Sequence, residues 1–294
     1  MKGLVEKVSV LAVNYNRADL IKETIFSVLN QSYSNLEFVI IDDGSEDDSV
    51  NVINEIKDNR IKCYSISHIG HLGKLRNLAL SKITGEYFVF IDTDDLMKPD
   101  FISKSIDVIN KNNADFSICG VEQFNNKGFI KNLPVYKSSN FYSQEFKFID
   151  VLYNRLNCCL PAIVFKKNIL GNDLTFNENM TLPDHEFVSF ASYYFKGIVI
   201  DESLISVRRH GKNMTAIEKV DSYFYFIETV RKFYEIKAIS TIQKNKMLGL
   251  LHYLVGNYYL NHSNKRLATS NYKKSIIYYP FKIKSYFKLA MTWI

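Results

Sequence analysis

Short hydrophobic runs alternate with amphipathic stretches through the first 120 residues of the chain. Four runs rich in β-branched and aromatic side chains have the length of buried strands, namely Val8–Val13, Leu36–Ile41, Ile61–Ile66 and Tyr87–Ile91. Apolar positions with helical spacing lie between them, near Asp19–Asn30, Ser49–Lys57 and Lys74–Lys82. Because strands that alternate with helices build βαβ units, the pattern predicts an α/β fold with a parallel, doubly wound sheet.

The hydrophobic pattern changes twice beyond this region. Asp115–Cys119 predicts a further strand, and the Gly, Asn, Lys and Ser residues of Val121–Pro161 predict a loop-rich excursion over the sheet edge. Later apolar runs predict a helix at Asp184–Tyr194, strands at Ile198–Ile200 and Leu204–Arg208, and only helices after about Thr215. We therefore expect one domain over residues 1–215 and a helical region over residues 216–294.

Charge is distributed unevenly between these two parts. The net charge is +6, but Arg231–Ile294 holds twelve Lys or Arg residues and one acid, Glu235, which leaves 25 bases and 30 acids before it. A basic, aromatic-rich helical region favours an anionic surface, and residues 231–294 are expected to associate peripherally with anionic membrane. The alternative is an ordinary helical cap on the first domain. No nucleic-acid-binding motif accompanies the charge, so no nucleic-acid partner is expected.

Cysteine usage and the N-terminus bear on the compartment. The four cysteines, Cys63, Cys119, Cys158 and Cys159, form no C-x-x-C pair and no zinc-ligand pattern, which is typical of free thiols in a reducing compartment. The chain begins with neither a signal peptide nor any apolar run long enough to span a bilayer. These features predict a cytoplasmic protein that touches a membrane at most peripherally.

Polar residues follow three of the expected strands at the point where each strand ends. The first is followed by Asn14-Tyr15-Asn16-Arg17, the second by Asp42-Asp43-Gly44-Ser45 and the fourth by Asp92-Thr93-Asp94-Asp95. In open α/β sheets, ligands bind outside the carboxyl ends of the strands. Three carboxylates within four residues repel one another, so the cluster predicts a hard divalent cation, Mn²⁺ or Mg²⁺, that also binds phosphate oxygens. A solvated acidic turn and a structural Ca²⁺ site are the alternatives. No glycine-rich phosphate loop is present, which leaves the phosphates to the metal.

Three segments at these positions closely resemble the bacterial family 2 glycosyltransferases of the GT-A fold. They are V-S-V-L-A-V-N-Y-N-R, L-N-Q-S-Y-S-N-L-E-F-V-I-I-D-D-G-S and G-K-L-R-N-L-A-L-S-K-I-T-G-E-Y-F-V-F-I-D-T-D-D. The resemblance is dense over residues 7–100 and thinner to about 215. It implies a Rossmann-like, mainly parallel sheet flanked by helices, with a nucleotide-sugar half of about 1–120 and an acceptor half of about 121–215. It also implies an inverting transfer of one sugar from a nucleotide diphosphate, commonly UDP, to an acceptor hydroxyl.

The resemblance implies roles for the residues that contact the nucleotide. Asn14 and Tyr15 would lie beside the base, and Asp43 would accept a hydrogen bond from its imide N–H, which suits uracil. An Asx-turn around Gly44 is the alternative explanation for Asp43. Arg76 would contact the nucleotide or its phosphates, unless it is a solvent-exposed arginine on a helix.

The resemblance also implies a metal site. Asp94 and Asp95 would face ribose and metal, with Asp92 supporting them, and His210 would complete the metal site unless it is an ordinary loop residue. Arg208, Arg209 and Lys212 would be diphosphate contacts.

An inverting transfer needs a general base for the acceptor hydroxyl, and Asp184 matches that position. The family usually has Glu-Asp where this chain has Pro183-Asp184, so Glu186 is the substitute for the missing supporting carboxylate. The alternative is that Asp184 only caps a helix.

The sequence therefore predicts a non-processive hexosyl- or N-acetylhexosaminyltransferase. Its substrates would be a UDP-sugar and a glycan or lipid-linked acceptor of surface polysaccharide, lipopolysaccharide or teichoic-acid biosynthesis. The Q-x-x-R-W motif of processive relatives is absent. We expect the protein at the inner face of the cell membrane, either alone or as an oligomer. An inactive nucleotide-sugar-binding scaffold is the alternative, because Pro183 departs from the family pattern.

Overall fold

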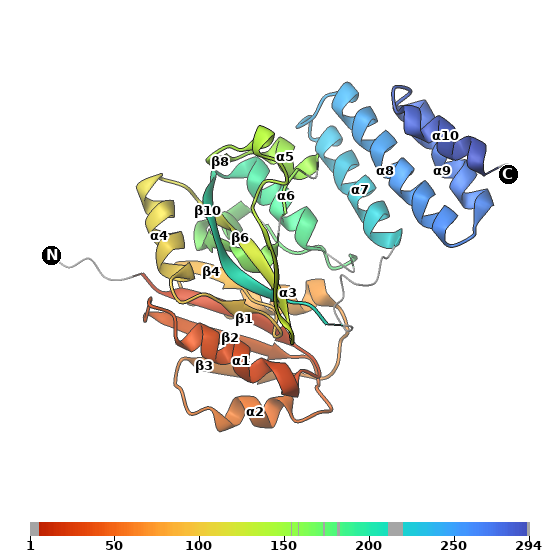
Figure 1. Ribbon diagram of the computed structural model, residues 1–294. Helices are drawn as coiled ribbons and strands as arrows, with labels where there is room; N and C mark the ends of the chain where they lie inside the picture. The colour runs from red at the N-terminus through yellow and green to blue at the C-terminus, as the bar shows by residue number, and fades with distance from the viewer. Residues whose placement is uncertain are drawn as a thin grey trace. The chain divides into compact units, whose positions relative to one another are not determined.

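The protein is described by a computed structural model that covers residues 6–153, 155–157, 159–172, 174–180, 183–210 and 220–292. The chain forms two compact units, Met1–Asn213 and Met214–Ile294. Figure 1 labels the helices and strands of both units.

One mixed sheet organises the first unit, with the strand order β3-β2-β1-β4-β9-β6-β10-β5. Its central strands are β1 (Val8–Asn14), β2 (Leu36–Asp42), β3 (Ile61–Ser65), β4 (Tyr87–Phe90), β9 (Ile163–Lys166), β6 (Phe116–Asn125) and β10 (Gly197–Arg208). Three short or peripheral strands pair with these, namely β5 (Leu96–Met97), β7 (Gly128–Leu133) and β8 (Glu145–Phe146). Strands β1 to β4 are mutually parallel, and β9 inserts antiparallel between β4 and β6. The predicted parallel first half of the sheet is confirmed.

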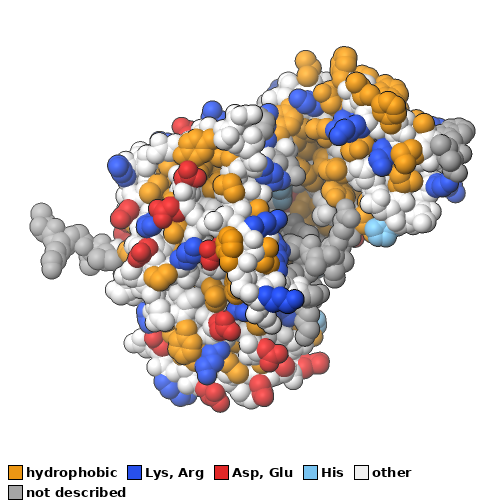
Figure 2. Space-filling model, viewed as in Figure 1, with side chains coloured by type: hydrophobic (Ala, Val, Ile, Leu, Met, Phe, Trp, Pro, Cys, Tyr) orange, Lys and Arg blue, Asp and Glu red, His pale blue; other side chains and the backbone are white. Residues whose placement is uncertain are grey.

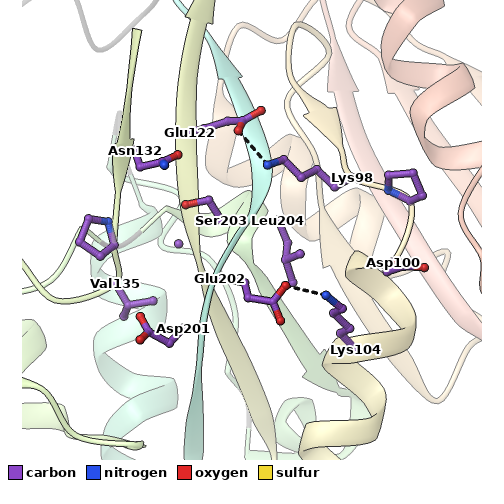
Figure 3. Close-up of a pocket in the computed structure, with 13 residues that line it drawn as sticks. Lys98, Asp100, Lys104, Glu122, Asn132, Val135, Asp201, Glu202, Ser203 and Leu204 are labelled. Carbon is purple, nitrogen blue, oxygen red and sulfur yellow. Dashed lines mark hydrogen bonds and ion pairs between the residues drawn. The ribbon is translucent and has the colours of Figure 1, made fainter. Parts of the chain in front are cut away.

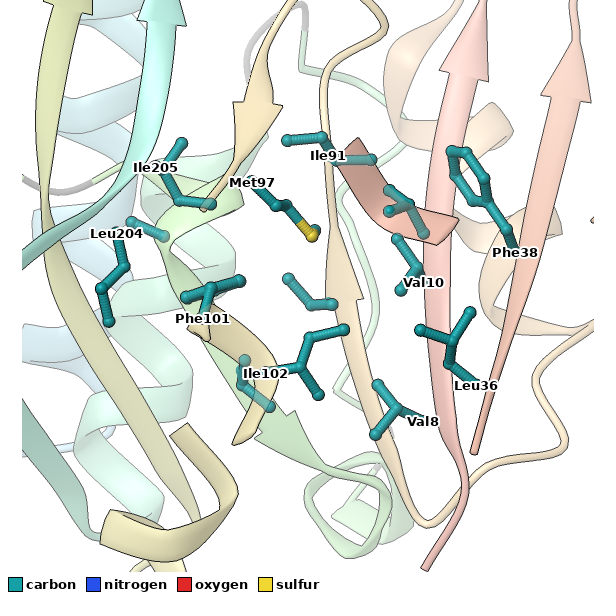
Figure 4. Close-up of a cluster of buried hydrophobic side chains, with 14 of the residues drawn as sticks. Val8, Val10, Leu36, Phe38, Ile91, Met97, Phe101, Ile102, Leu204 and Ile205 are labelled. Atoms are coloured by element: carbon teal, nitrogen blue, oxygen red, sulfur yellow. The ribbon is translucent and has the colours of Figure 1, made fainter. Parts of the chain in front are cut away.

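Helices cover both faces of this sheet because β1 and β2 are apolar on both sides. Val8, Val10 and Ala12 of β1 join one core, whereas Leu11 joins the other. The first core, shown in Figure 4, packs against α1 (Ala18–Leu29), α2 (Ser49–Glu55) and α4 (Phe101–Lys111). The second packs against α3 (Leu72–Leu80), α5 (Phe148–Leu152) and α6 (Asp184–Tyr194). Short 3-10 turns lie at Ser139–Phe141, Leu160–Ala162 and Lys167–Asn172.

Two expectations about the middle of the chain were wrong. Val121–Pro161 is not simply a loop-rich excursion, because β6 continues to Asn125 and turns into the antiparallel β7. The edge strand β7 is exposed, and its apolar and polar residues do not alternate, so it lacks the period-two signal of a half-buried strand. The two strands expected at Ile198–Ile200 and Leu204–Arg208 are one strand, β10, whose register shifts at Ser203.

The second unit consists of helices, as the sequence pattern predicts for this region. They are α7 (Val220–Glu235), α8 (Thr241–Asn261), α9 (Lys265–Tyr278) and α10 (Ile283–Met291), and each packs on the next. A capping box begins α8, in which Ser240 and Gln243 satisfy each other's backbone N–H groups. Helices α8 and α9 approach closely where Gly256 leaves room for the Tyr272 ring. Among the described residues, no helix is long and apolar enough to cross a membrane.

Glu37 forms a buried polar connection between three strands of the first unit. Its carboxylate accepts hydrogen bonds from Ser9 (2.6 Å), Lys62 (2.6 Å) and the Thr84 hydroxyl (2.8 Å). Burial alone would raise the pKa of Glu37, but these bonds outweigh it and hold the pKa well below its ordinary value of 4.5. The ionised carboxylate therefore stabilises the fold.

We expect Glu37→Gln to lower the free energy of unfolding by about 2 kcal/mol at neutral pH, because a buried set of charged hydrogen bonds is broken while the lysines stay partly hydrated. The stabilisation exists above pH 4.5 and is lost as pH falls below it, so variant and wild type should converge in acid. Urea unfolding across this pH range measures the difference. Glu55→Gln on the exposed side of α2 is the matched control, and an equal loss there would contradict the assignment.

Candidate functional site

The ends of β1, β2 and β4 meet at one edge of the sheet. Asn14 at the end of β1 is in register with Asp42 at the end of β2, and β4 leads directly into the acidic cluster. Asn14 is fully buried, and its side-chain amide donates to Asp42 (2.7 Å) and to Ser45 (3.2 Å). These bonds join the two strand ends, so the polar residues after them are held in fixed positions.

Asp43 binds the loop that follows β3. Its carboxylate accepts hydrogen bonds from the backbone N–H groups of Ile69 (2.6 Å) and Gly70 (2.9 Å), and Nδ1 of His68 lies 3.0 Å from the same carboxylate. The ring of His68 in turn stacks on Tyr15, with centroids 4.3 Å apart. The structure thus brings Tyr15 and Asp43 together around His68, a residue to which the sequence pattern assigns no role.

This arrangement depends on Gly44, the residue directly after Asp43. Its φ of +68° lies in the left-handed region, and a side-chain Cβ would come within 2.8 Å of the His68 backbone nitrogen. The D-D-G-S segment therefore needs glycine for both conformation and space. Gly70, whose backbone N–H donates to Asp43, also has a positive φ, so the loop around His68 needs glycine at this position as well.

The three acids after β4 have different surroundings. Oδ2 of Asp94 lies 2.9 Å from Nε2 of His210, so these two side chains are in direct contact. Asp95 is buried, and its carboxylate accepts a hydrogen bond from the backbone N–H of Arg208 (2.9 Å). Asp92 keeps about half of its side chain exposed, at 53%. Of the three, Asp94 is the one that the structure joins to the predicted histidine.

Electrostatic repulsion marks this cluster. Burial raises the pKa of Asp95 well above its ordinary value, and the charges of Asp92 and Asp94 raise it further. The pKa of Asp92 is also raised, chiefly because the surrounding protein removes water from part of its carboxylate. The charge of Arg76 lowers this pKa, and the charge of Asp94 raises it. A positive charge placed among these carboxylates would relieve the repulsion.

Arg76 connects the cluster to the predicted base. It lies on α3 and is buried, so the alternative of a solvent-exposed arginine is wrong. Its guanidinium lies against the rings of Phe90 and Phe176, forms an ion pair with Asp184, and reaches to 3.8 Å from Asp92. Burial lowers the pKa of Arg76 to about 10, which still leaves it charged at neutral pH.

Asp184 begins helix α6 and keeps about a third of its side chain exposed. Pro183 occupies the N-cap position, so the alternative in which Asp184 caps the helix is not what the structure has. Glu186 is buried one position beyond His185, whose pKa burial lowers to about 4. The carboxylate of Asp184 therefore has one strong cationic neighbour, Arg76, and remains partly open to solvent.

The basic residues at the end of β10 have different hydrogen-bond and ion-pair partners. Arg208 is buried, pairs with Glu23 at 2.6 Å and lies 4.6 Å from the Phe124 ring centre. The Arg208 side chain also donates to the backbone carbonyl of Asp94 (3.0 Å), so it fixes the backbone of the acidic cluster. The backbone N–H of Arg209 donates to Phe124. Lys212, the third predicted diphosphate contact, lies outside the described residues.

The pair Asp94 and His210 suits a divalent cation. Metal–ligand distances of about 2.1 Å with octahedral angles separate neighbouring ligand atoms by about 3 Å, close to the spacing seen here. Carboxylate and imidazole are both accepted by Mn²⁺, and Mg²⁺ commonly takes one or two protein ligands plus phosphate oxygens. Within the described ranges, no three His, Cys, Asp or Glu side chains converge on one metal position. Among the described residues, Asp94 and His210 are therefore two candidate ligands that lie at a suitable spacing.

A separate pocket of about 560 Å³ lies between α4, β6, β7 and β10. Figure 3 shows its charged side chains pairing with each other, Lys98 with Glu122 at 2.7 Å and Lys104 with Glu202 at 2.5 Å. None of the predicted site residues lines it. The pocket is therefore not part of the site at the strand ends.

Comparison with known proteins gives a family and a fold. The model of the family named Glycosyl transferase family 2 matches residues 9–171. WfaP of Escherichia coli, named as a UDP-Glc:alpha-D-GlcNAc-diphosphoundecaprenol beta-1,3-glucosyltransferase, is 38% identical over 112 residues, which are 38% of this chain and 45% of that protein.

Two solved structures resemble nearly the whole chain. TarS of S. aureus in complex with UDP-GlcNAc has a TM-score of 0.67 at 18% identity, over 96% of this chain and 92% of that one. The mannosyltransferase PcManGT of Pyrobaculum calidifontis, in complex with GDP-Man and Mn²⁺, has a TM-score of 0.59 at 16% identity, over 98% and 80%. At these identities the likeness shows the fold. The predicted GT-A-type α/β fold with C-terminal helices is confirmed.

Proposed function

Since the chain belongs to glycosyl transferase family 2, we propose that it is an inverting, non-processive transferase that moves one hexosyl or N-acetylhexosaminyl group from a UDP-sugar to an acceptor hydroxyl. One observation carries the proposal. Arg76 contacts both Asp92 and Asp184, and the contact between Asp94 and His210 lies in the same acidic cluster after β4. Charged groups for the leaving diphosphate and a base for the acceptor are thereby assigned to neighbouring positions.

The donor nucleotide would bind at the ends of β1 and β2. Oδ1 of the buried Asn14 has no hydrogen-bond partner, which leaves an acceptor at this edge. Tyr15 stacks on His68 but keeps 38% of its surface exposed, and Asp43 offers carboxylate lone pairs beyond its contacts with Ile69, Gly70 and His68. An acceptor of this kind suits the imide N–H of uracil. UDP as the nucleotide agrees with the donor in the name of WfaP and with the ligand in the TarS structure.

Asp94 and His210 would hold the divalent cation, Mn²⁺ or Mg²⁺, with Asp95 as a further ligand or ribose contact and Asp92 in support. When bound, the cation would neutralise the charge that develops on the diphosphate as the sugar bond breaks. Arg208 holds both residues in place, because its side chain donates to the backbone carbonyl of Asp94 and its backbone N–H donates to the carboxylate of Asp95. The Mn²⁺ in the PcManGT structure supports a metal in this fold.

Asp184 would act as the general base. The acceptor oxygen attacks the anomeric carbon, its proton passes to the Asp184 carboxylate, and the bond from that carbon to the diphosphate oxygen breaks on the opposite face. This sequence of bond changes inverts the anomeric configuration. Arg76 orients the carboxylate through their ion pair.

The acceptor would be a glycan or a lipid-linked sugar in surface polysaccharide, lipopolysaccharide or teichoic-acid biosynthesis. The diphosphoundecaprenol in the name of WfaP supports the lipid-linked choice. A lipid-linked acceptor would place the reaction at the inner face of the cell membrane.

A panel of nucleotide-sugars tests the proposal through release of the nucleotide. We expect the purified chain, with Mn²⁺ or Mg²⁺ present, to release UDP from at least one UDP-sugar and to leave GDP-sugars largely intact. The reason is size: if Asp43 meets the imide N–H of a pyrimidine such as uracil, the larger purine ring of guanine cannot take the same position without shifting its ribose and diphosphate. Binding of UDP without release from any donor would instead support the second candidate, an inactive scaffold, which Pro183 in place of the family's usual acid keeps in consideration.

A further inference from the structure

Helix α10 has its apolar side turned away from the protein. Residues Ile283, Phe287 and Met291 recur at four-residue spacing, with Tyr286 beside them, and all four are exposed. The side that packs on α9 instead carries Ser285, which bonds to Ser275 (2.8 Å), the half-buried Leu289, and then Thr292, which bonds to Thr269 (2.8 Å). An amphipathic helix normally buries its apolar stripe, so the orientation of α10 is reversed.

The end of α9 and the turn that follows it extend this apolar surface. Ile277 is 77% exposed and Phe281 is 80% exposed, and they precede the exposed Ile283 of α10. We call the set Ile277, Phe281, Ile283, Tyr286, Phe287 and Met291 the α10 apolar surface. Figure 2 shows hydrophobic side chains gathered over the helices of this unit, with Lys and Arg side chains beside them. Large side chains that protrude this far are uncommon on a surface that stays in water.

Positive charge borders the α10 apolar surface. Lys282, Lys284 and Lys288 lie on or directly before α10, and Lys273 and Lys274 lie on α9. From Ile236 to Ile294 the sequence has ten Lys or Arg residues and no Asp or Glu. Lysine stems can lie along an apolar surface while their ammonium groups reach outward to anionic groups.

We propose that the α10 apolar surface inserts into the interface of an anionic lipid bilayer, with the bordering lysines against the lipid phosphates. The side chains form a protruding surface that a fluid layer can surround, and an in-plane helix with apolar and cationic sides is the arrangement that such interfaces bind. A second copy of the chain fits less well, because a two-fold contact would bring two basic regions without any acid against each other. This inference requires neither the sugar donor nor the acceptor.

Vesicle flotation of the full chain tests the proposal. We expect binding to mixed phosphatidylglycerol–phosphatidylcholine vesicles, weak binding to pure phosphatidylcholine vesicles, and release at high salt. Ile283→Ser combined with Phe287→Ser should lower partitioning roughly tenfold or more, because two large apolar side chains no longer leave water. Lys284→Glu combined with Lys288→Glu should lower binding to the anionic vesicles by roughly tenfold while neutral vesicles bind as before.

The turn between α7 and α8 and the first turn of α8 supply matched controls, since α10 packs on α9 and this segment lies at the far end of α8 in the sequence of helices. Ile242→Ser removes a side chain that is 81% exposed, and Lys237→Glu combined with Lys244→Glu makes the same change in charge. Both controls should bind vesicles within about twofold of wild type.

Three results would overturn the proposal. The first is equal binding to neutral and anionic vesicles, and the second is unchanged binding by the Ile283 and Phe287 variant. The third is that the wild-type chain does not bind the vesicles. If the Ile283 and Phe287 variant then also loses an oligomer, the surface contacts a second copy, and if its melting temperature falls, the surface packs within the chain itself. The far-ultraviolet circular dichroism of each variant distinguishes a loss of membrane binding from a loss of folding.

Discussion

Replacing Asp94 by Asn should lower nucleotide release from the UDP-sugar by about a thousandfold, because stabilisation of the departing diphosphate is worth several kcal/mol. The structure singles out Asp94 among the acids, since its carboxylate faces Nε2 of His210 at 2.9 Å. An amide keeps the size of the side chain but loses the charge that holds a hard cation. The rate of UDP release at saturating donor and metal measures the effect.

The role of the metal can be separated from the rate. Titration of Mn²⁺ by its electron paramagnetic signal should show weaker binding in Asp94→Asn and in His210→Ala, and excess EDTA should stop turnover of the wild type. Asp58→Asn is the matched control, because that surface acid pairs with Arg60 far along the chain from the cluster. Wild-type turnover in Asp94→Asn and Asp95→Asn, or full activity in EDTA, would refute the metal assignment.

Most of the first unit could be predicted because its signals are local. Strands β1 and β2 are apolar on both faces, and α1 places Ile21, Ile25 and Val28 on one side, so period and length identify each element. Strand β9 could not be predicted, because its pairing depends on residues far away in the sequence. It has four residues, follows Pro161, and gains its pairing only from β4 and β6.

The site could be predicted only in part, since sequence spacing says little about which distant residues meet. The acids after β4 and the D-D-G-S segment were found because they follow strands directly. The ion pair between Arg76 and Asp184 joins positions on α3 and α6 that no local pattern relates. The role of His68 depends on the positive φ of Gly44 and Gly70, which turns the loop onto Asp43.

The second unit shows a similar limit. A helical, basic and aromatic region was predicted, and helices are found there. The sequence gives the apolar stripe of α10 but not the direction in which it points. That direction follows from Ser285 and Thr292, whose hydroxyls hydrogen bond to α9 and leave Phe287 in solvent. Tertiary hydrogen bonds thus decided what a hydrophobic pattern alone would have assigned to the core.

The second large effect is expected from Asp184→Asn, which should lower sugar transfer to the acceptor by about a hundredfold to ten-thousandfold, the usual contribution of a general base. UDP-sugar binding, measured by calorimetry, should change little, because Asp184 contacts Arg76 and not the strand ends where the nucleotide is proposed to lie. A loss in kcat with an unchanged donor affinity separates proton transfer from binding. Asp107→Asn on the exposed side of α4 is the matched control.

Arg76 makes this prediction sharper, because it holds Asp184 and also approaches Asp92 at 3.8 Å. Asp184 is not among the proposed ligands of the cation, and Arg76 reaches only the supporting acid Asp92, at 3.8 Å, so Asp184→Asn should not release the cluster from its cation. Mn²⁺ affinity should therefore stay near the wild-type value, whereas Asp94→Asn should lower it. If Asp184→Asn transfers sugar at the wild-type rate, the base lies elsewhere, and Glu186→Gln is the next variant to measure. If Asp184→Asn loses metal and turnover together, Arg76 and Asp184 act as part of the metal site.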